Sequence, residues 1–271
     1  MPWTIKELKS RGLAAFKANY WPCVAVAFLA IVVCEGLGGG GNAIFNRVIT
    51  SASAVDSDIY PRFAIGCFVL FMLAVILLRL LLRNPVQVGC ANFFLRLADA
   101  PADFNTVAAP FRTWKRVVKT MFLRDLFLSL WAVVPVLLGF VLAAVFFNSV
   151  WVPPVDDALG DGLLPTFLLF FVFLIPYFVK LYSYRLVPYL LADDPALSGR
   201  AAVTRSRALM DGHKGHAFLL DLSFIGWYIL SALTFGILLI FRVVPHVQAT
   251  NAALYRALSA PPPAPTPPPL P

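Results

Sequence analysis

Long runs of apolar residues alternate along this chain with shorter polar and basic segments. Each run has at least the roughly 18 residues that an α-helix needs to cross the hydrocarbon core of a bilayer. The runs cover residues 20–37, 63–82, 122–150, 164–184, 217–234 and 236–255, and the last is weaker because it contains Arg242, Pro245, His246 and Gln248. The pattern predicts an all-α polytopic membrane helical bundle with about six transmembrane helices in a membrane domain of residues 20–258.

Amphipathic segments flank the apolar runs. Residues 1–19 predict an interfacial helix, because Thr4 and Glu7 form a capping box and apolar positions recur on one face. Residues 104–119 have the same character and are interpreted either as a second interfacial segment or as a solvated connector. The basic residues expected to face lipid are Lys6, Lys9, Lys17, Arg112, Lys115, Arg116 and Lys119. Residues 259–271 predict a disordered proline-rich tail.

Composition and charge support this interpretation. The chain is 60% hydrophobic and 13% charged, far from the composition of soluble domains. Its net charge of +8 does not predict nucleic-acid binding, since no basic block with interleaved aromatic residues stands apart from the apolar runs. Lys and Arg instead number four, five and four in residues 1–19, 84–120 and 192–216, but two and none in residues 38–62 and 148–163. The positive-inside rule therefore predicts a multi-pass protein with both termini cytoplasmic.

The predicted topology can be tested with reporter fusions. We expect a reporter fused after Leu258 to report the cytoplasm and one inserted near Gly160 to report the outside, because Lys and Arg are retained on the inner side. Alkaline phosphatase and green fluorescent protein fusions measure the two locations. An external reporter after Leu258, with residues 217–234 intact, would mean that the sixth span does not exist.

Candidate chemistry is sparse in the sequence. The cysteines Cys23, Cys34, Cys67 and Cys90 lie in or beside apolar runs without metal-ligand spacing. The glycines of residues 36–41 satisfy a dinucleotide-binding spacing but follow a membrane span instead of a strand. Asp211, His213 and His216 lie close together near a glycine that is typical of a helix end. The sequence therefore predicts no catalytic, cofactor-binding or metal-binding residues, and no enzyme.

Charged residues inside the spans are the sharpest signal, because such groups are costly in a bilayer and are usually paired. Lys180 lies about 24 Å along the fourth span, and Asp221 about 6 Å into the fifth, at the same depth near the inner face. Asp221 is therefore predicted to pair with Lys180, or with Arg185. By the same argument Glu35 and Arg242 lie at matching depths near the outer face and are predicted to pair.

Three stretches resemble a known family. Residues 4–21, 189–227 and 233–258, with the signatures "SRALMDG" at 206–212 and "LSFIGW" at 222–227, are similar to the bacterial multi-pass membrane family catalogued as domain of unknown function 975. The chain has Ile175-Pro176-Tyr177 where that family usually has Ile-Pro-Gly, and Pro245-His246 where it has Pro-Tyr. The resemblance implies an integral protein of the bacterial cytoplasmic (inner) membrane and no particular reaction or cofactor.

Two functions of different classes follow from these features. The first is a non-catalytic membrane scaffold or partner-binding protein, which contacts membrane lipids, including anionic ones, and a protein partner at the cytoplasmic face. The alternative is a small-solute transporter or channel component, which the charged residues and prolines within the spans would serve. An intramembrane enzyme is a third hypothesis with less support.

Overall fold

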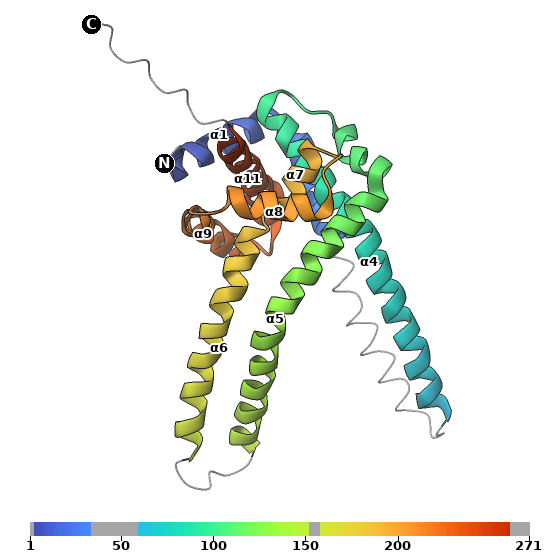
Figure 1. Ribbon diagram of the computed structural model, residues 1–271, viewed down its shortest axis with the longest axis vertical. Coiled ribbons are helices and arrows are strands. Elements are labelled where there is room, and N and C mark those ends of the chain that lie inside the picture. Colours follow the sequence, from blue (N-terminus) through green and yellow to red (C-terminus); the bar gives the residue numbers. More distant parts are fainter. Residues whose placement is uncertain (1–2, 34–58, 152–157, 261–271) are drawn as a thin grey trace, which may run out of the picture. The chain divides into compact units, whose positions relative to one another are not determined.

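The computed structural model describes residues 3–33, 59–151 and 158–260, and every regular element in these ranges is a helix (Figure 1). The predicted all-α class is thereby confirmed. The chain divides into two compact units, of which the first contains residues 1–112 and 220–271 and the second residues 113–219. Glu35, the glycine-rich residues 36–41 and the proline-rich tail from 261 onward lie outside the described ranges.

The first unit begins with the predicted amphipathic helix, α1 (Ile5–Ala18). Its cap is as predicted, because the Thr4 hydroxyl accepts a hydrogen bond from the Glu7 amide at 3.2 Å. Leu8, Gly12 and Phe16, one helical turn apart, are buried. The apolar face therefore packs against protein. The chain then bends by 104° into α2 (Tyr20–Ile31).

The face of α1 packs on α11 (Val244–Ser259), which lies beside it in Figure 1. The two helices approach closely at Gly12, where an added Cβ would lie 2.5 Å from Thr250 Oγ1 and 2.8 Å from the Thr250 amide nitrogen. α11 also packs against α2 and α4 (Ile59–Asp99), and Thr250, Leu254 and Tyr255 are fully buried. α11 is thus a central helix of this unit.

The end of α4 is covered by η2, a 3₁₀ helix (Phe104–Thr113). Gly89 allows this contact, since an added Cβ would lie 2.2 Å from the Val107 carbonyl oxygen. The Asn92 side chain donates a hydrogen bond to the Thr106 carbonyl at 2.8 Å. The predicted connector 104–119 is therefore not a single separate helix, because its second half already belongs to the next long helix, α5 (Trp114–Trp151).

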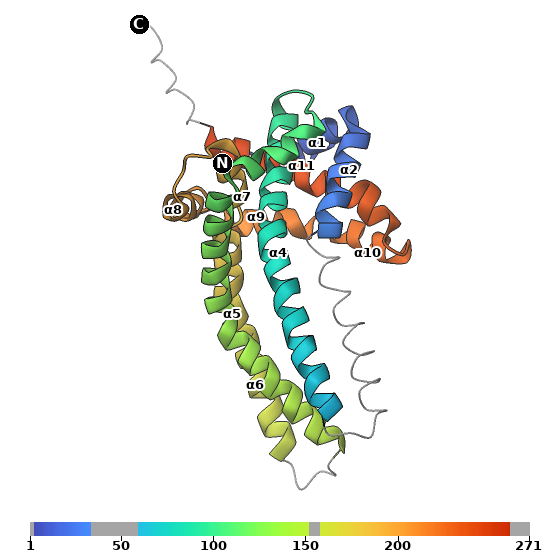
Figure 2. The same ribbon diagram turned by 90° about the vertical axis from the view of Figure 1, so that its right-hand side faces the viewer.

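The second unit is built on the hairpin of α5 and α6 (Ala158–Ser183), which lie side by side in both views (Figures 1 and 2). Their most apolar 18-residue windows are only 6% and 11% buried by protein. Such large exposed apolar surfaces are typical of helices covered by lipid. The short helices α7 (Val187–Asp193) and α8 (Gly199–Leu209) follow α6, and the buried Ser206 hydroxyl donates to the Ser183 carbonyl at 2.8 Å.

Three helical segments of the described chain are long and apolar enough to cross a membrane: Phe104–Ala144, Phe167–Asp193 and Lys214–Leu233. A fourth is possible if α1 and the bent α2 form one span. The predicted count of about six is not confirmed. The fifth predicted span, residues 217–234, corresponds to the candidate Lys214–Leu233, in which a turn at Ser223–Phe224 separates α9 (Lys214–Leu222) from α10 (Ile225–Leu233). The sixth, residues 236–255, is not among these candidates and divides into the π-helix η3 (Leu239–Val243) and the largely buried α11.

Candidate functional site

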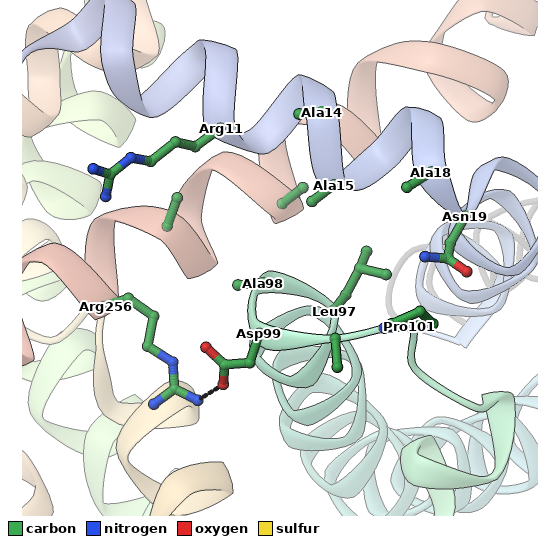
Figure 3. Close-up of a pocket in the computed structure, with 13 residues that line it drawn as sticks. Arg11, Ala14, Ala15, Ala18, Asn19, Leu97, Ala98, Asp99, Pro101 and Arg256 are labelled. Carbon is green, nitrogen blue, oxygen red and sulfur yellow. Dashed lines mark hydrogen bonds and ion pairs between the residues drawn. The ribbon is translucent and has the colours of Figure 1, made fainter.

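A groove of about 620 Å³ lies in the first unit between α1, the end of α4 and α11 (Figure 3). Three elements that are distant in sequence contribute to it, so it exists only in the folded unit. Its lining consists of Arg11, Ala14, Ala15, Ala18, Asn19, Leu97, Ala98, Asp99, Ala100, Pro101, Ala249, Ala253 and Arg256.

Alanine dominates the lining. On α11, Ala249, Ala253 and Arg256 are spaced by four and three residues and so share one face of the helix. On α1, Ala14 and Ala18 are likewise one turn apart. Close packing of α1 on α11 at Gly12 brings these faces together, and methyl side chains leave the space between them open. Methyl groups therefore make up most of the apolar lining of the groove.

Two arginines provide the charge of the groove. Arg256 on α11 forms an ion pair with Asp99 at the end of α4, at 2.5 Å, and Arg11 on α1 forms one with Glu7 at 2.6 Å. Figure 3 shows Arg11 and Arg256 on one side and Asn19 with Pro101 on the other. Both ion pairs are partly exposed and so contribute only about 0–1 kcal/mol each. An anionic ligand could therefore compete for either guanidinium.

The lining groups can form ion pairs and hydrogen bonds with a ligand. Within the groove the described side chains offer two guanidinium groups, one carboxylate and one amide. Guanidinium groups form paired hydrogen bonds with carboxylates or phosphates. The arrangement is suited to recognising a segment that carries a carboxylate and otherwise small or apolar side chains.

The predicted lipid-facing basic residues have different environments. Lys6 and Lys17 are exposed on α1, and Arg112, Lys115, Arg116 and Lys119 are exposed around the start of α5. Lys9 is half-buried, donates to the Ser223 carbonyl at 3.1 Å and lies 4.4 Å from the centre of the Phe224 ring. Burial lowers the pKa of Lys9. Lys9 thus joins α1 to the break between α9 and α10, and lipid contact by the other residues stays a prediction.

The predicted partners of Asp221 lie in the second unit, whereas Asp221 is half-buried on α9 in the first. Lys180 Nζ lies 4.9 Å from the ring centre of Trp131, and the Arg185 guanidinium 5.6 Å from that of Tyr182. A cation over an aromatic face is stabilised by the ring quadrupole. The structure therefore gives each cation an aromatic contact, and the pairing of Asp221 with Lys180 or Arg185 stays a prediction.

Arg242 is the described half of the other predicted pair. It lies on η3, and its guanidinium carbon is 4.8 Å from the ring centre of Trp227 on α10. Its Nε is buried and has no hydrogen-bond acceptor among the residues that the structure describes. Glu35 lies outside those residues. The pair therefore stays a prediction.

The groove itself was not predicted from the sequence. A usable signal exists in the spacing of small residues one turn apart, Ala14 with Ala18 and Ala249 with Ala253. Such spacing indicates close helix packing in membrane proteins. The contribution of Asp99 and Arg256 could not be predicted in the same way, because the two residues are 157 positions apart in the chain.

Comparison with known proteins places the chain in a family. No curated protein and no solved structure matches it significantly. Residues 16–261 match the family described as "Protein of unknown function (DUF975)", which covers most of the sequence, and this confirms the resemblance found in the sequence. The apolar helices fit a membrane protein. The chain therefore belongs to the DUF975 family.

Proposed function

We propose that this protein is a non-catalytic membrane scaffold that binds an acidic amphipathic helix of a partner protein in the alanine-lined groove. The observation that carries the proposal is the groove itself, in which seven alanines and two arginines line one space. Small side chains let two helices approach closely, and arginines select a carboxylate on the incoming helix.

The composition of the lining favours a helix over a small ligand. Small-molecule sites are lined mainly by large hydrophobic and aromatic side chains that enclose the ligand. Here Leu97 is the largest apolar side chain of the lining, and four of the alanines are exposed on the rim. The helix would lie along α1 and α11 with its acidic residue near Arg11 and Arg256.

If the partner helix binds in the groove, large side chains placed there should displace it. In the double variant Ala14→Trp and Ala18→Trp, two indole rings would occupy the rim, so we expect at least a tenfold loss of the bound partner. Ala14 and Ala18 are exposed, so the variant should keep its fold. The measurement is quantitative mass spectrometry of proteins that co-purify with the full chain from native membranes, with a photo-crosslinker at Ala15 to identify the contacting peptide.

The matched control is Ala208→Trp, an exposed alanine on α8 of the second unit. It adds the same indole outside the groove and should leave the crosslinked partner unchanged. Crosslinked peptides should contain Asp or Glu on an amphipathic helical pattern. Equal recovery of the partner with the groove variant and the control, both folded, would contradict the proposal.

A small-solute transporter remains the second candidate, and one observation favours it. Helices interrupted within the membrane frequently form substrate sites in transporters. In this chain α9 and α10 are separated at Ser223–Phe224, and the π-helix η3 carries Arg242 beside Trp227. A transporter would lose solute flux in liposomes when Arg242 is neutralised, whereas a scaffold would lose only stability.

A further inference from the structure

A second groove, of about 570 Å³, lies in the second unit where α5 begins and α8 starts. It is lined by Arg116, Lys119, Thr120, Phe122, Leu123, Leu126, Ser198, Gly199 and Arg200. Within this lining three residues are cations and none is a carboxylate. The groove is therefore strongly basic, and it is separate from the alanine-lined groove.

Packing of α8 on α5 brings basic residues of the two helices to one groove. Gly199 at the start of α8 touches α5, since an added Cβ would lie 3.0 Å from Thr120 Oγ1. The Arg116 guanidinium donates to the Pro195 carbonyl at 3.0 Å, which holds it toward the segment before α8. Arg200 follows Gly199 directly, so it is carried to the same groove as Lys119. Cations from two helices thus line one space.

Polarity changes along α5 within the groove. Arg116, Lys119 and Thr120 come first, and Phe122, Leu123 and Leu126 follow. The helix rises about 15 Å from residue 116 to residue 126. Phe122 and Leu126 are 49% and 41% exposed, and beyond them α5 continues as a candidate membrane span. The groove therefore lies where the charged start of α5 meets its apolar part.

We propose that this groove binds one anionic phospholipid, with its phosphate between Arg116, Lys119 and Arg200 and an acyl chain along Phe122 and Leu126. The cations match the phosphate charge, and the apolar half matches the chain attached to it. Basic pockets beside transmembrane helices bind anionic headgroups in this way. The site is more specific than a diffuse attraction to the membrane surface, because it requires Arg200 on α8 as well as α5.

The test uses the full chain in nanodiscs of phosphatidylcholine with about 20% phosphatidylglycerol, a composition that keeps neutral lipid in excess. The readout is the number of phosphatidylglycerol molecules that stay bound after transfer to mild detergent, measured by native mass spectrometry. For the double variant Lys119→Gln and Arg200→Gln we expect binding to fall about 25-fold, since each basic residue near an anionic lipid contributes about fivefold.

A matched control distinguishes lipid binding in the groove from attraction that depends only on the net charge of the protein. Lys115→Gln with Arg205→Gln removes one cation from each of the same two helices, but neither residue lines the groove. We expect this control to change binding less than twofold. An equal loss in both double variants, with unchanged circular dichroism, would overturn the proposal, because attraction would then depend only on net charge.

A final arm distinguishes lipid from a soluble phosphate compound. We expect 10-fold molar excesses of glycerol 3-phosphate over the lipid not to displace it, because the soluble headgroup lacks the acyl chain that contacts Leu126. Leu126→Gln should weaken phosphatidylglycerol binding while the cations remain. Displacement by glycerol 3-phosphate, together with unchanged lipid binding of Leu126→Gln, would assign the groove to a soluble phosphate compound and overturn the lipid proposal.

Discussion

Gly12→Leu is expected to destabilise the first unit by about 3 kcal/mol, the upper end of the usual cost of overpacking a core. A Cβ at this position would lie 2.5 Å from Thr250 Oγ1 and 2.9 Å from the Thr250 Cα, so α1 must move away from α11. Leucine has a higher helix propensity than glycine by about 0.8 kcal/mol. An observed loss of stability would therefore report the lost helix contact and not a weaker helix.

The measurement is chemical unfolding of the purified chain in detergent, followed by tryptophan fluorescence. Ala14→Leu is the matched control, because Ala14 is exposed on the same helix and should change stability by less than about 0.5 kcal/mol. Adding Thr250→Ala to Gly12→Leu should recover only part of the loss, since the backbone nitrogen of residue 250 is still 2.8 Å from the new Cβ. A variant as stable as the control would contradict the close contact.

Local signals in the sequence predicted α1 well. The Thr4 cap and the buried positions Leu8, Gly12 and Phe16 depend on residues within a few turns of one another. What covers this face could not be predicted, because α11 lies more than 200 residues further along the chain. The same pattern of apolar spacing is typical of a helix at a lipid interface and of a helix packed against protein. The sequence alone therefore does not distinguish the predicted membrane surface from packing on α11.

The break between α9 and α10 was not predicted for a related reason. Residues 217–234 form one apolar run without proline, which is typical of an unbroken span. In the structure the Ser223 hydroxyl donates to the Leu220 carbonyl at 2.6 Å, and the Ser223 carbonyl accepts from Lys9 at 3.1 Å. A serine hydroxyl can compete with helical hydrogen bonding, but the lysine that stabilises the break comes from α1. Only the tertiary structure brings the two together.

The polar residues of the last apolar run weaken the prediction of a membrane span there. His246 and Gln248 made residues 236–255 a weak span, and the structure divides the run into η3 and the buried α11. His246 there faces protein, with its Nε2 3.2 Å from the Lys9 carbonyl and its ring against Phe224. The ion pair of Arg256 with Asp99 could not be predicted from the sequence. Exposed charged residues near predicted loops are common, and their positions do not indicate a distant partner.

Arg242→Glu and Glu35→Arg are each expected to destabilise the protein by about 3–5 kcal/mol, the usual cost of breaking a buried ion pair. Glu35 lies about 22 Å along its predicted span and Arg242 about 10 Å below the same outer boundary, so the sequence places them at one depth. Arg242 has a buried Nε without an acceptor among the described residues. Glu35, if it pairs with Arg242 as predicted, would supply an acceptor for that group.

The double swap, Glu35→Arg with Arg242→Glu, should recover most of the stability if the two residues pair. Trp227 sets a limit to the recovery, because its ring face favours the cation that lies 4.8 Å from its centre and repels a carboxylate. Adding Trp227→Leu to the double swap should therefore restore a further part of the lost stability. A double swap no better than the sum of the single changes would disprove the pairing and favour Arg242 reaching the outer headgroups instead.

Measuring solute flux in the Glu35 and Arg242 variants distinguishes the scaffold from the transporter. If the pair only joins helices, liposomes that contain the double swap should behave as the wild type does in any flux assay. If the pair lines a solute path, the swap would restore stability without restoring flux, since each charge would then face the solute from the opposite helix. Recovered stability with unchanged flux would therefore assign Glu35 and Arg242 to packing, and leave the alanine-lined groove as the functional surface.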